Sequence, residues 1–77
     1  MERKIEIGKV YKHFKGHIYK VIALGKDSED LSLKVVYQNT LNGDVWIRNY
    51  DEFNSKVDSI KYPNVSQEYR FEEIHDN

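Results

Sequence analysis

The sequence predicts a mainly β domain: a small, strongly bent antiparallel sheet or an SH3-like barrel with one short helical turn. Three observations lead to this fold class. The chain has 77 residues, which is enough for one thin hydrophobic core. Several short runs are rich in β-branched and aromatic residues and end at glycine, asparagine or aspartate. Between two of these runs lies Asn42-Gly43, the strongest short hairpin signal. We therefore treat residues 1–77 as a single domain.

The first part of the chain predicts an arm and one strand. Ile5 and Ile7 alternate with charged residues before a glycine, so residues 1–7 are expected to form a lead-in strand or arm. Residues 10–14 follow as a strand. Lys15-Gly16 then supplies a turn.

The middle of the chain predicts the body of the sheet. Residues 18–24 place apolar side chains on both faces, which is typical of a central strand that is wetted on neither face. Residues 33–37 form the next strand and residues 45–48 return as its partner. Asn42-Gly43 between them predicts a type I′ turn, which requires positive φ at both central residues.

After residue 48 the pattern changes to that of a helix. Asn49 is a capping residue, and Glu52 follows three positions later. Tyr50 and Phe53 give one apolar face, so a single helical turn is expected. A brief strand is predicted near Val57. Residues 69–74 are expected to form a last anchoring strand or turn, with residues 75–77 as a frayed tail.

Composition narrows the function classes. The chain has no cysteine, which excludes disulfide frameworks and thiol chemistry. No apolar run is long enough for a signal peptide or a membrane span, so we expect a cytoplasmic protein without a membrane partner. His13 and His17 flank a turn and have no acidic ligand nearby in sequence. This spacing predicts no metal site and no cofactor.

Charge is distributed unevenly along a chain whose net charge is −1. Residues 1–20 carry six basic residues against two glutamates, whereas residues 66–77 carry one arginine against four acidic residues. The two ends could lie side by side and neutralise each other. Alternatively, the basic residues could cluster as a patch for phosphates.

Several spaced blocks of the sequence resemble a known family. They are Gly8, Tyr11 to Gly16, Tyr19, Val21, Asp27 to Glu29, Val35 to Tyr37, Trp46 to Arg48, Glu52, Phe53 and Arg70-Phe71. In this order they are similar to the bacterial family catalogued as domain of unknown function 1653 (DUF1653), from about Gly8 to Ile74. The resemblance implies a compact, mostly β bacterial protein, and it implies no activity.

The aromatic and basic residues of the sheet are the best candidates for a ligand-binding face. Aromatic residues make up 13% of the chain, and tyrosines suit half-wet surfaces because each has an apolar body and a polar tip. We expect a non-enzymatic binding module for a nucleic-acid strand, a nucleotide-like ligand or an extended peptide. Arg48 would pair with a phosphate or carboxylate and Lys15 would steer it. The candidate face comprises Tyr11, His13, Lys15, Tyr19, Tyr37, Trp46 and Arg48.

Other interpretations of the same residues remain open. Tyr37 and Trp46 could belong to the core, and Arg48 could pair with Glu52. A small enzyme could use His13 with the carboxylate of Glu29 or Glu52. The aromatic face could also be a homodimer interface, so we expect either a monomer or a weak homodimer.

Overall fold

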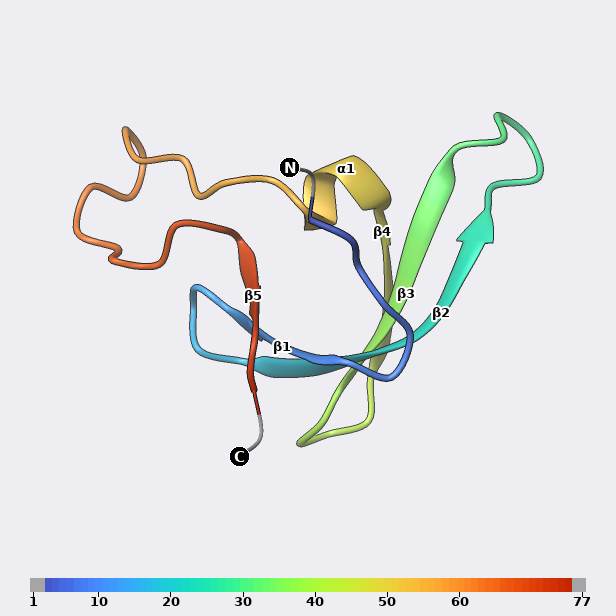
Figure 1. The fold of residues 1–77 in the computed structure, drawn as a ribbon, viewed down its shortest axis with the longest axis horizontal. Helices are drawn as coiled ribbons and strands as arrows, with labels where there is room; N and C mark the ends of the chain where they lie inside the picture. The colour runs from blue at the N-terminus through green and yellow to red at the C-terminus, as the bar shows by residue number, and fades with distance from the viewer. Residues whose placement is uncertain (1–2, 76–77) are drawn as a thin grey trace.

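The computed structural model describes residues 3–75 and shows five strands and one helical turn (Figure 1). The predictions for residues 1–2 and 76–77 lie outside the described residues. No helix within the described range is long and apolar enough to cross a membrane. In chain order the elements are β1 (Val10–His13), β2 (Ile18–Lys26), β3 (Leu33–Asn39), β4 (Val45–Asn49), α1 (Tyr50–Phe53) and β5 (Phe71–Glu73).

All five strands belong to one antiparallel sheet in the order β4-β3-β2-β1-β5. The sheet curls strongly, and a register shift between Val21 and Ala23 on β2 marks an irregularity in its middle. Such bulges bend a strand and increase its twist. The mainly β, strongly bent sheet is therefore confirmed. The barrel alternative is wrong, because β4 and β5 stand at opposite edges and do not pair.

The core fills the inner face of this curl, and it is built largely from aromatic rings. Phe53 from α1 stacks on Phe71 from β5 with ring centroids 4.0 Å apart, and Tyr11 meets Phe53 edge-on at 5.4 Å. Each such ring buries a large area, which suits a sheet with few core positions. The high aromatic content thus serves the core first. The buried cluster is Ile5, Tyr11, Val21, Val35, Tyr37, Phe53 and Phe71.

The central position of β2 is confirmed, but the prediction that neither face is wetted is wrong. Val21 on the inner face is fully buried, whereas Ile22 is 38% exposed. Ile18 is exposed to a similar degree. Among the described residues there is no second layer over the outer face, so apolar residues there remain partly in water. A strand that is apolar on both faces can thus be central in its sheet and still be covered on one side only.

The β3–β4 hairpin is confirmed, but its turn is not of type I′. Of the two expected residues only Gly43 has positive φ, at 81°. The N–H of Asn39 donates to the carbonyl of Asp44, so the connection spans residues 40–43. The buried side chain of Asn39 accepts hydrogen bonds from the N–H groups of Leu41 and Asn42, at 2.8 and 3.2 Å. These bonds stabilise the wider loop.

The helical turn α1 is confirmed and is tied to the N-terminal arm. Asn49 makes no capping bond to the helix backbone; its amide donates to the Glu52 side chain at 3.3 Å. The described part of the arm contains no strand. It runs beside α1 (Figure 1). There the Ile5 N–H donates to the Tyr50 hydroxyl, and the Asn54 side chain donates to the carbonyl of Arg3.

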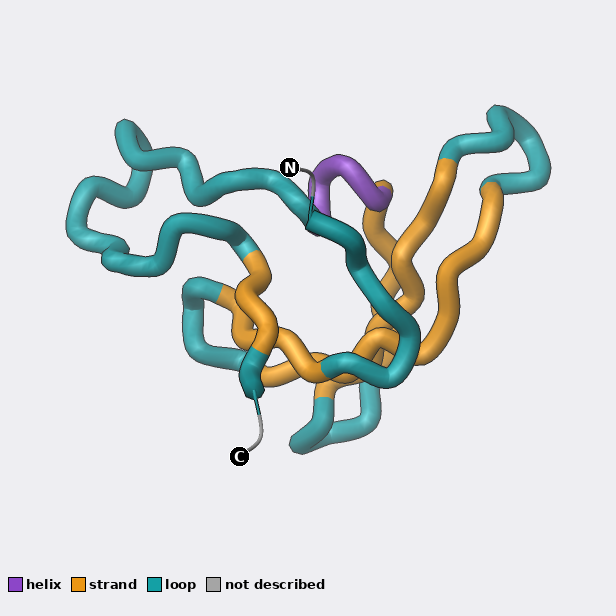
Figure 2. The backbone as a smooth tube through the Cα atoms, viewed as in Figure 1, coloured by secondary structure: helices purple, strands orange, loops and turns teal. Residues whose placement is uncertain are grey.

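The long connection from α1 to β5 stands out on one side of the sheet (Figure 2). Within it, Lys56 and Tyr69 form an isolated bridge in place of the brief strand predicted near Val57. The last strand is shorter than predicted. It pairs with β1, which sets Lys12 opposite Glu72 and Lys9 within 3.9 Å of Glu73. The basic and acidic ends of the chain therefore do lie side by side.

Candidate functional site

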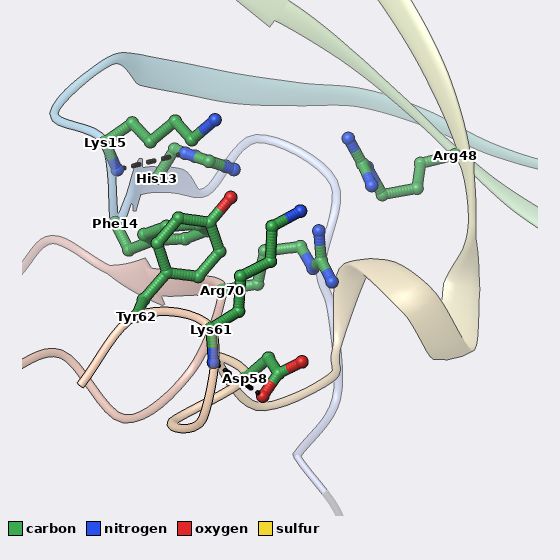
Figure 3. Close-up of a pocket in the computed structure, with 8 residues that line it drawn as sticks. All are labelled: His13, Phe14, Lys15, Arg48, Asp58, Lys61, Tyr62 and Arg70. Atoms are coloured by element: carbon green, nitrogen blue, oxygen red, sulfur yellow. Dashed lines mark hydrogen bonds between the residues drawn. The ribbon is translucent and has the colours of Figure 1, made fainter. Parts of the chain in front are cut away.

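A cleft of about 390 Å³ opens between the β1–β2 turn, β4 and the connection that precedes β5. Figure 3 shows Arg48 on one side of this cleft and His13 and Lys15 on the other. The remaining walls come from the α1–β5 connection, including Arg70, which directly precedes β5. The lining residues are His13, Phe14, Lys15, Arg48, Asp58, Lys61, Tyr62 and Arg70.

The cleft is strongly cationic. Four of its side chains are lysine or arginine, and Asp58 is its single carboxylate. Asp58 is already engaged, because its Oδ1 accepts the N–H groups of Ile60 and Lys61. Within residues 3–75 no ion pair involves the four cations of the cleft. In a chain with a net charge of −1, this is a local concentration of positive charge.

Each arginine of the cleft is held in place by a hydrogen bond from its own Nε atom. Arg48 Nε donates to the Tyr37 hydroxyl at 3.2 Å, and Arg70 Nε donates to Ser55 Oγ at 3.3 Å. Neither bond uses the two terminal nitrogens of the guanidinium group. Those nitrogens form the fork that binds carboxylate or phosphate in a bidentate manner. The arginines are thus oriented without being neutralised.

His13 lies in the wall of the cleft as a neutral donor. Its ring stacks on Phe14 at 4.5 Å, and its Nδ1 accepts the N–H of Lys15 at 3.1 Å. That bond assigns the ring proton to Nε2. Burial, together with the smaller effect of the nearby charges of Arg48 and Arg70, lowers the pKa of His13 to about 4. At neutral pH the ring therefore adds a hydrogen-bond donor without adding charge.

An aromatic wall completes the cleft. Tyr62 packs against Phe14 with centroids 4.9 Å apart. The ammonium groups of Lys15 and Lys61 lie 5.7 and 5.4 Å from the Tyr62 ring. Cations over an aromatic face are favourable, so the lysines remain near the cleft without a carboxylate partner.

The strand register brings most of the sequence-predicted residues to one face. Tyr11 pairs with Tyr19, Val21 with Tyr37, and Tyr37 with Trp46. Because side chains alternate along a strand, the predicted residues on β1 to β4 share the inner face. These are Tyr11, His13, Tyr19, Tyr37, Trp46 and Arg48.

The predicted residues nevertheless have different environments. His13, Lys15 and Arg48 line the cleft. Tyr11 and Tyr37 are only 2% and 4% exposed, so their rings belong to the core and cannot stack on a ligand.

The other two aromatic residues lie outside the cleft lining. Tyr19 is half-buried and packs edge-on against Tyr37 at 5.1 Å. Trp46 does not line the cleft and is 51% exposed on β4. Of the two, only Trp46 offers a largely accessible ring.

The predicted partners of His13 and Arg48 are different in the structure. No hydrogen bond or ion pair of the described residues joins His13 to Glu29 or Glu52, and the charged groups that shift its pKa are all basic. Glu29 lies in the exposed β2–β3 turn, and Glu52 accepts from Asn49. Arg48 bonds to Tyr37 instead of Glu52. The His–carboxylate pair is therefore not formed.

Several cleft residues were not singled out from the sequence. Lys61 and Tyr62 lie in the α1–β5 connection, whose sequence has no periodicity. Arg70 precedes β5, and its only sequence signal was its place beside Phe71 in the resemblance. The additional lining residues are Phe14, Asp58, Lys61, Tyr62 and Arg70.

Fold and cleft together define a small open-sheet domain with a cationic, aromatic-walled cleft. The chain belongs to the family described as protein of unknown function (DUF1653), whose model matches residues 9–73. This range includes every strand and every residue that lines the cleft. No curated protein and no solved structure matches the chain.

Proposed function

We propose that this domain is a non-enzymatic binding module that captures a phosphate group of a nucleotide-like ligand or nucleic-acid strand in the cationic cleft. The observation that carries the proposal is the convergence of two oriented arginines and two lysines around one cleft without an ion-pair partner in the described chain. A cytoplasmic location, as the sequence predicts, would give the module access to such ligands.

The chemistry of the cleft favours phosphate over a neutral ligand. Arg48 and Arg70 offer bidentate forks, which match the geometry of a phosphate. The neutral His13 ring can donate from Nε2 to a further oxygen. Tyr62 and Phe14 offer ring surface on which a base can stack. The cleft volume of about 390 Å³ lies within the range of small-molecule sites.

The same geometry argues against acid–base catalysis by His13. The lone pair of its Nδ1 is used by the Lys15 N–H, and with a pKa of about 4 the ring is a weak base at neutral pH. Asp58 is held by two backbone N–H groups. Binding is therefore the better-supported role for this cleft.

The test measures binding of fluorescently labelled single-stranded oligonucleotides and mononucleotides by polarisation at several salt concentrations. Lys15→Gln is compared with Lys20→Gln, which makes the same change on the exposed outer face of β2. Lys15→Gln should weaken binding and reduce the salt slope by about one. Arg48→Gln should weaken binding further, because it also removes a bidentate fork.

Two results would contradict the proposal. One is the absence of binding by every phosphate ligand at low salt. The other is an equal loss of affinity in Lys15→Gln and Lys20→Gln. That result would mean that the ligand is attracted by the positive charge of the whole surface and is not held in the cleft. A parallel panel of extended peptides identifies the competing ligand class: binding of acidic peptides without binding of phosphates would assign the cleft to carboxylates.

A further inference from the structure

The edge strand β4 lacks the usual protection of a sheet edge. It is five residues long and carries no lysine or proline. Ile47 and Trp46 on it are 67% and 51% exposed. The opposite edge, β5, has only three residues, two of which are glutamates. Natural proteins shorten or charge their exposed edges to avoid unwanted pairing. The strand β5 follows that rule, whereas β4 is longer and has a single charged residue, Arg48.

The backbone of β4 offers alternate hydrogen-bonding groups to a further strand. The Asn39 N–H donates to Asp44 across this hairpin, while the Thr40 N–H donates to Ile18 on the other side of β3. Antiparallel ladders alternate, so Trp46 and Arg48 direct their N–H and C=O groups toward β3. Val45 and Ile47 direct theirs away from the sheet. Within residues 3–75 no strand pairs with that side of β4.

We propose that β4 pairs in antiparallel fashion with β4 of a second copy of this chain, about a two-fold axis at Ile47. In this register the N–H of each Ile47 donates to the carbonyl of the other copy's Ile47. The register satisfies the alternation, because Ile47 is one of the residues whose backbone faces outward. The two sheets join into one continuous sheet through an isologous interface.

The side chains of β4 are complementary to themselves in this arrangement. Positions equidistant from Ile47 face each other, so Trp46 of each copy lies opposite Arg48 of the other. Trp46 and Arg48 share the inner face, and an arginine over an indole face is a favourable cross-strand pair. On the outer face the two Ile47 side chains meet each other. This self-complementarity selects a second copy over an unrelated peptide.

Pairing would also extend the candidate site. The second copy's Trp46 would lie beside Arg48, whose Nε is already fixed by Tyr37. The cleft that Arg48 lines would thereby gain an aromatic neighbour. The proposed dimer does not depend on the proposed ligand, because its argument uses only the β4 edge.

The single tryptophan of the chain lies at the proposed interface, which gives a direct readout. Light scattering and sedimentation of the full chain over a concentration series should show a monomer–dimer equilibrium. Trp46 emission should shift to the blue with increasing concentration at constant far-UV circular dichroism. Ile47→Lys should be monomeric, because two lysines would face each other at the axis. Ile60→Lys, at a 92% exposed position, makes the same change elsewhere and should still dimerise.

Three outcomes would overturn the proposal. The first is a wild-type chain that remains monomeric up to its highest soluble concentration. The second is a dimer that persists in Ile47→Lys. The third is a dimer with no change in tryptophan emission on dilution. Because the dilution series uses the wild-type chain, a folding defect in Ile47→Lys leaves the first and third tests intact.

Discussion

Acidification should destabilise this domain in a way that depends on His13. The pKa of His13 is lowered from 6.5 to about 4 in the folded chain, mainly by burial and then by Arg48 and Arg70. Between these two pH values the unfolded chain binds a proton at this ring and the folded chain does not. The free energy of unfolding should therefore fall as the pH decreases from about 6.5 to about 4. The loss that His13 causes is complete only below its pKa in the folded chain.

The magnitude follows from the size of the shift. The two pKa values for His13 correspond to an upper limit of roughly 3 kcal/mol, because one pKa unit is about 1.4 kcal/mol. Solvent reaches part of the side chain, so screening reduces the expected loss to about 1–2 kcal/mol. That is a large share of a small domain's stability, which is about 4–11 kcal/mol for this length.

The measurement is urea unfolding followed by tryptophan emission at several pH values between 7 and 4. His13→Asn keeps an acceptor for the Lys15 N–H but does not titrate, so it should lose about 1–2 kcal/mol less than wild type on acidification. His17→Asn changes an exposed histidine of the same turn and serves as the control. Parallel loss of stability in the wild-type chain and His13→Asn would refute the argument.

Three further predictions concern the core, the support of the site and the hairpin. Phe53→Ala should cost about 3–5 kcal/mol in the free energy of unfolding by urea, because it empties the centre of the aromatic core; a loss below about 1 kcal/mol would contradict that packing. Tyr37→Phe should change stability by about 1 kcal/mol or less but weaken phosphate binding several-fold, because it removes the hydroxyl group that orients Arg48. Unchanged affinity would show that the bond between Arg48 and Tyr37 is dispensable for binding. Gly43→Ala should cost about 1 kcal/mol because its φ is 81°, whereas Gly25→Ala, at a glycine without positive φ, should cost less in the same unfolding experiment.

Local sequence signals predicted the elements well because their causes are local. The β-branched runs became β2, β3 and β4, and the residues after Asn49 became α1. Errors arose where distant contacts or side chains decide the outcome. The hairpin loop is wider than Asn42-Gly43 alone indicates, because the Asn39 side chain bonds its backbone. The sheet stays open because β5 pairs with β1 and not with β4.

The candidate site could be predicted only in part for a similar reason. Alternation along strands places His13 and Arg48 on one face, which a sequence can indicate. Strand alternation cannot indicate which tyrosines on that face are buried. In the structure Tyr11 and Tyr37 are part of the core. Arg70 and the residues of the α1–β5 connection reach the cleft only through tertiary folding. No periodic pattern in that connection marks them.

The pairing of the first strand with the last has a consequence for how the molecule assembles. His13 on β1 pairs with Phe71 on β5, and contacts between such distant positions close late and slow folding. We therefore expect the β1 to β4 part of the sheet to form before β5 is added to its edge. That strand delivers Phe71 to the core as it brings Arg70 to the cleft. Completion of the core and assembly of the cleft thus belong to the same final step, and a chain interrupted before β5 would have neither.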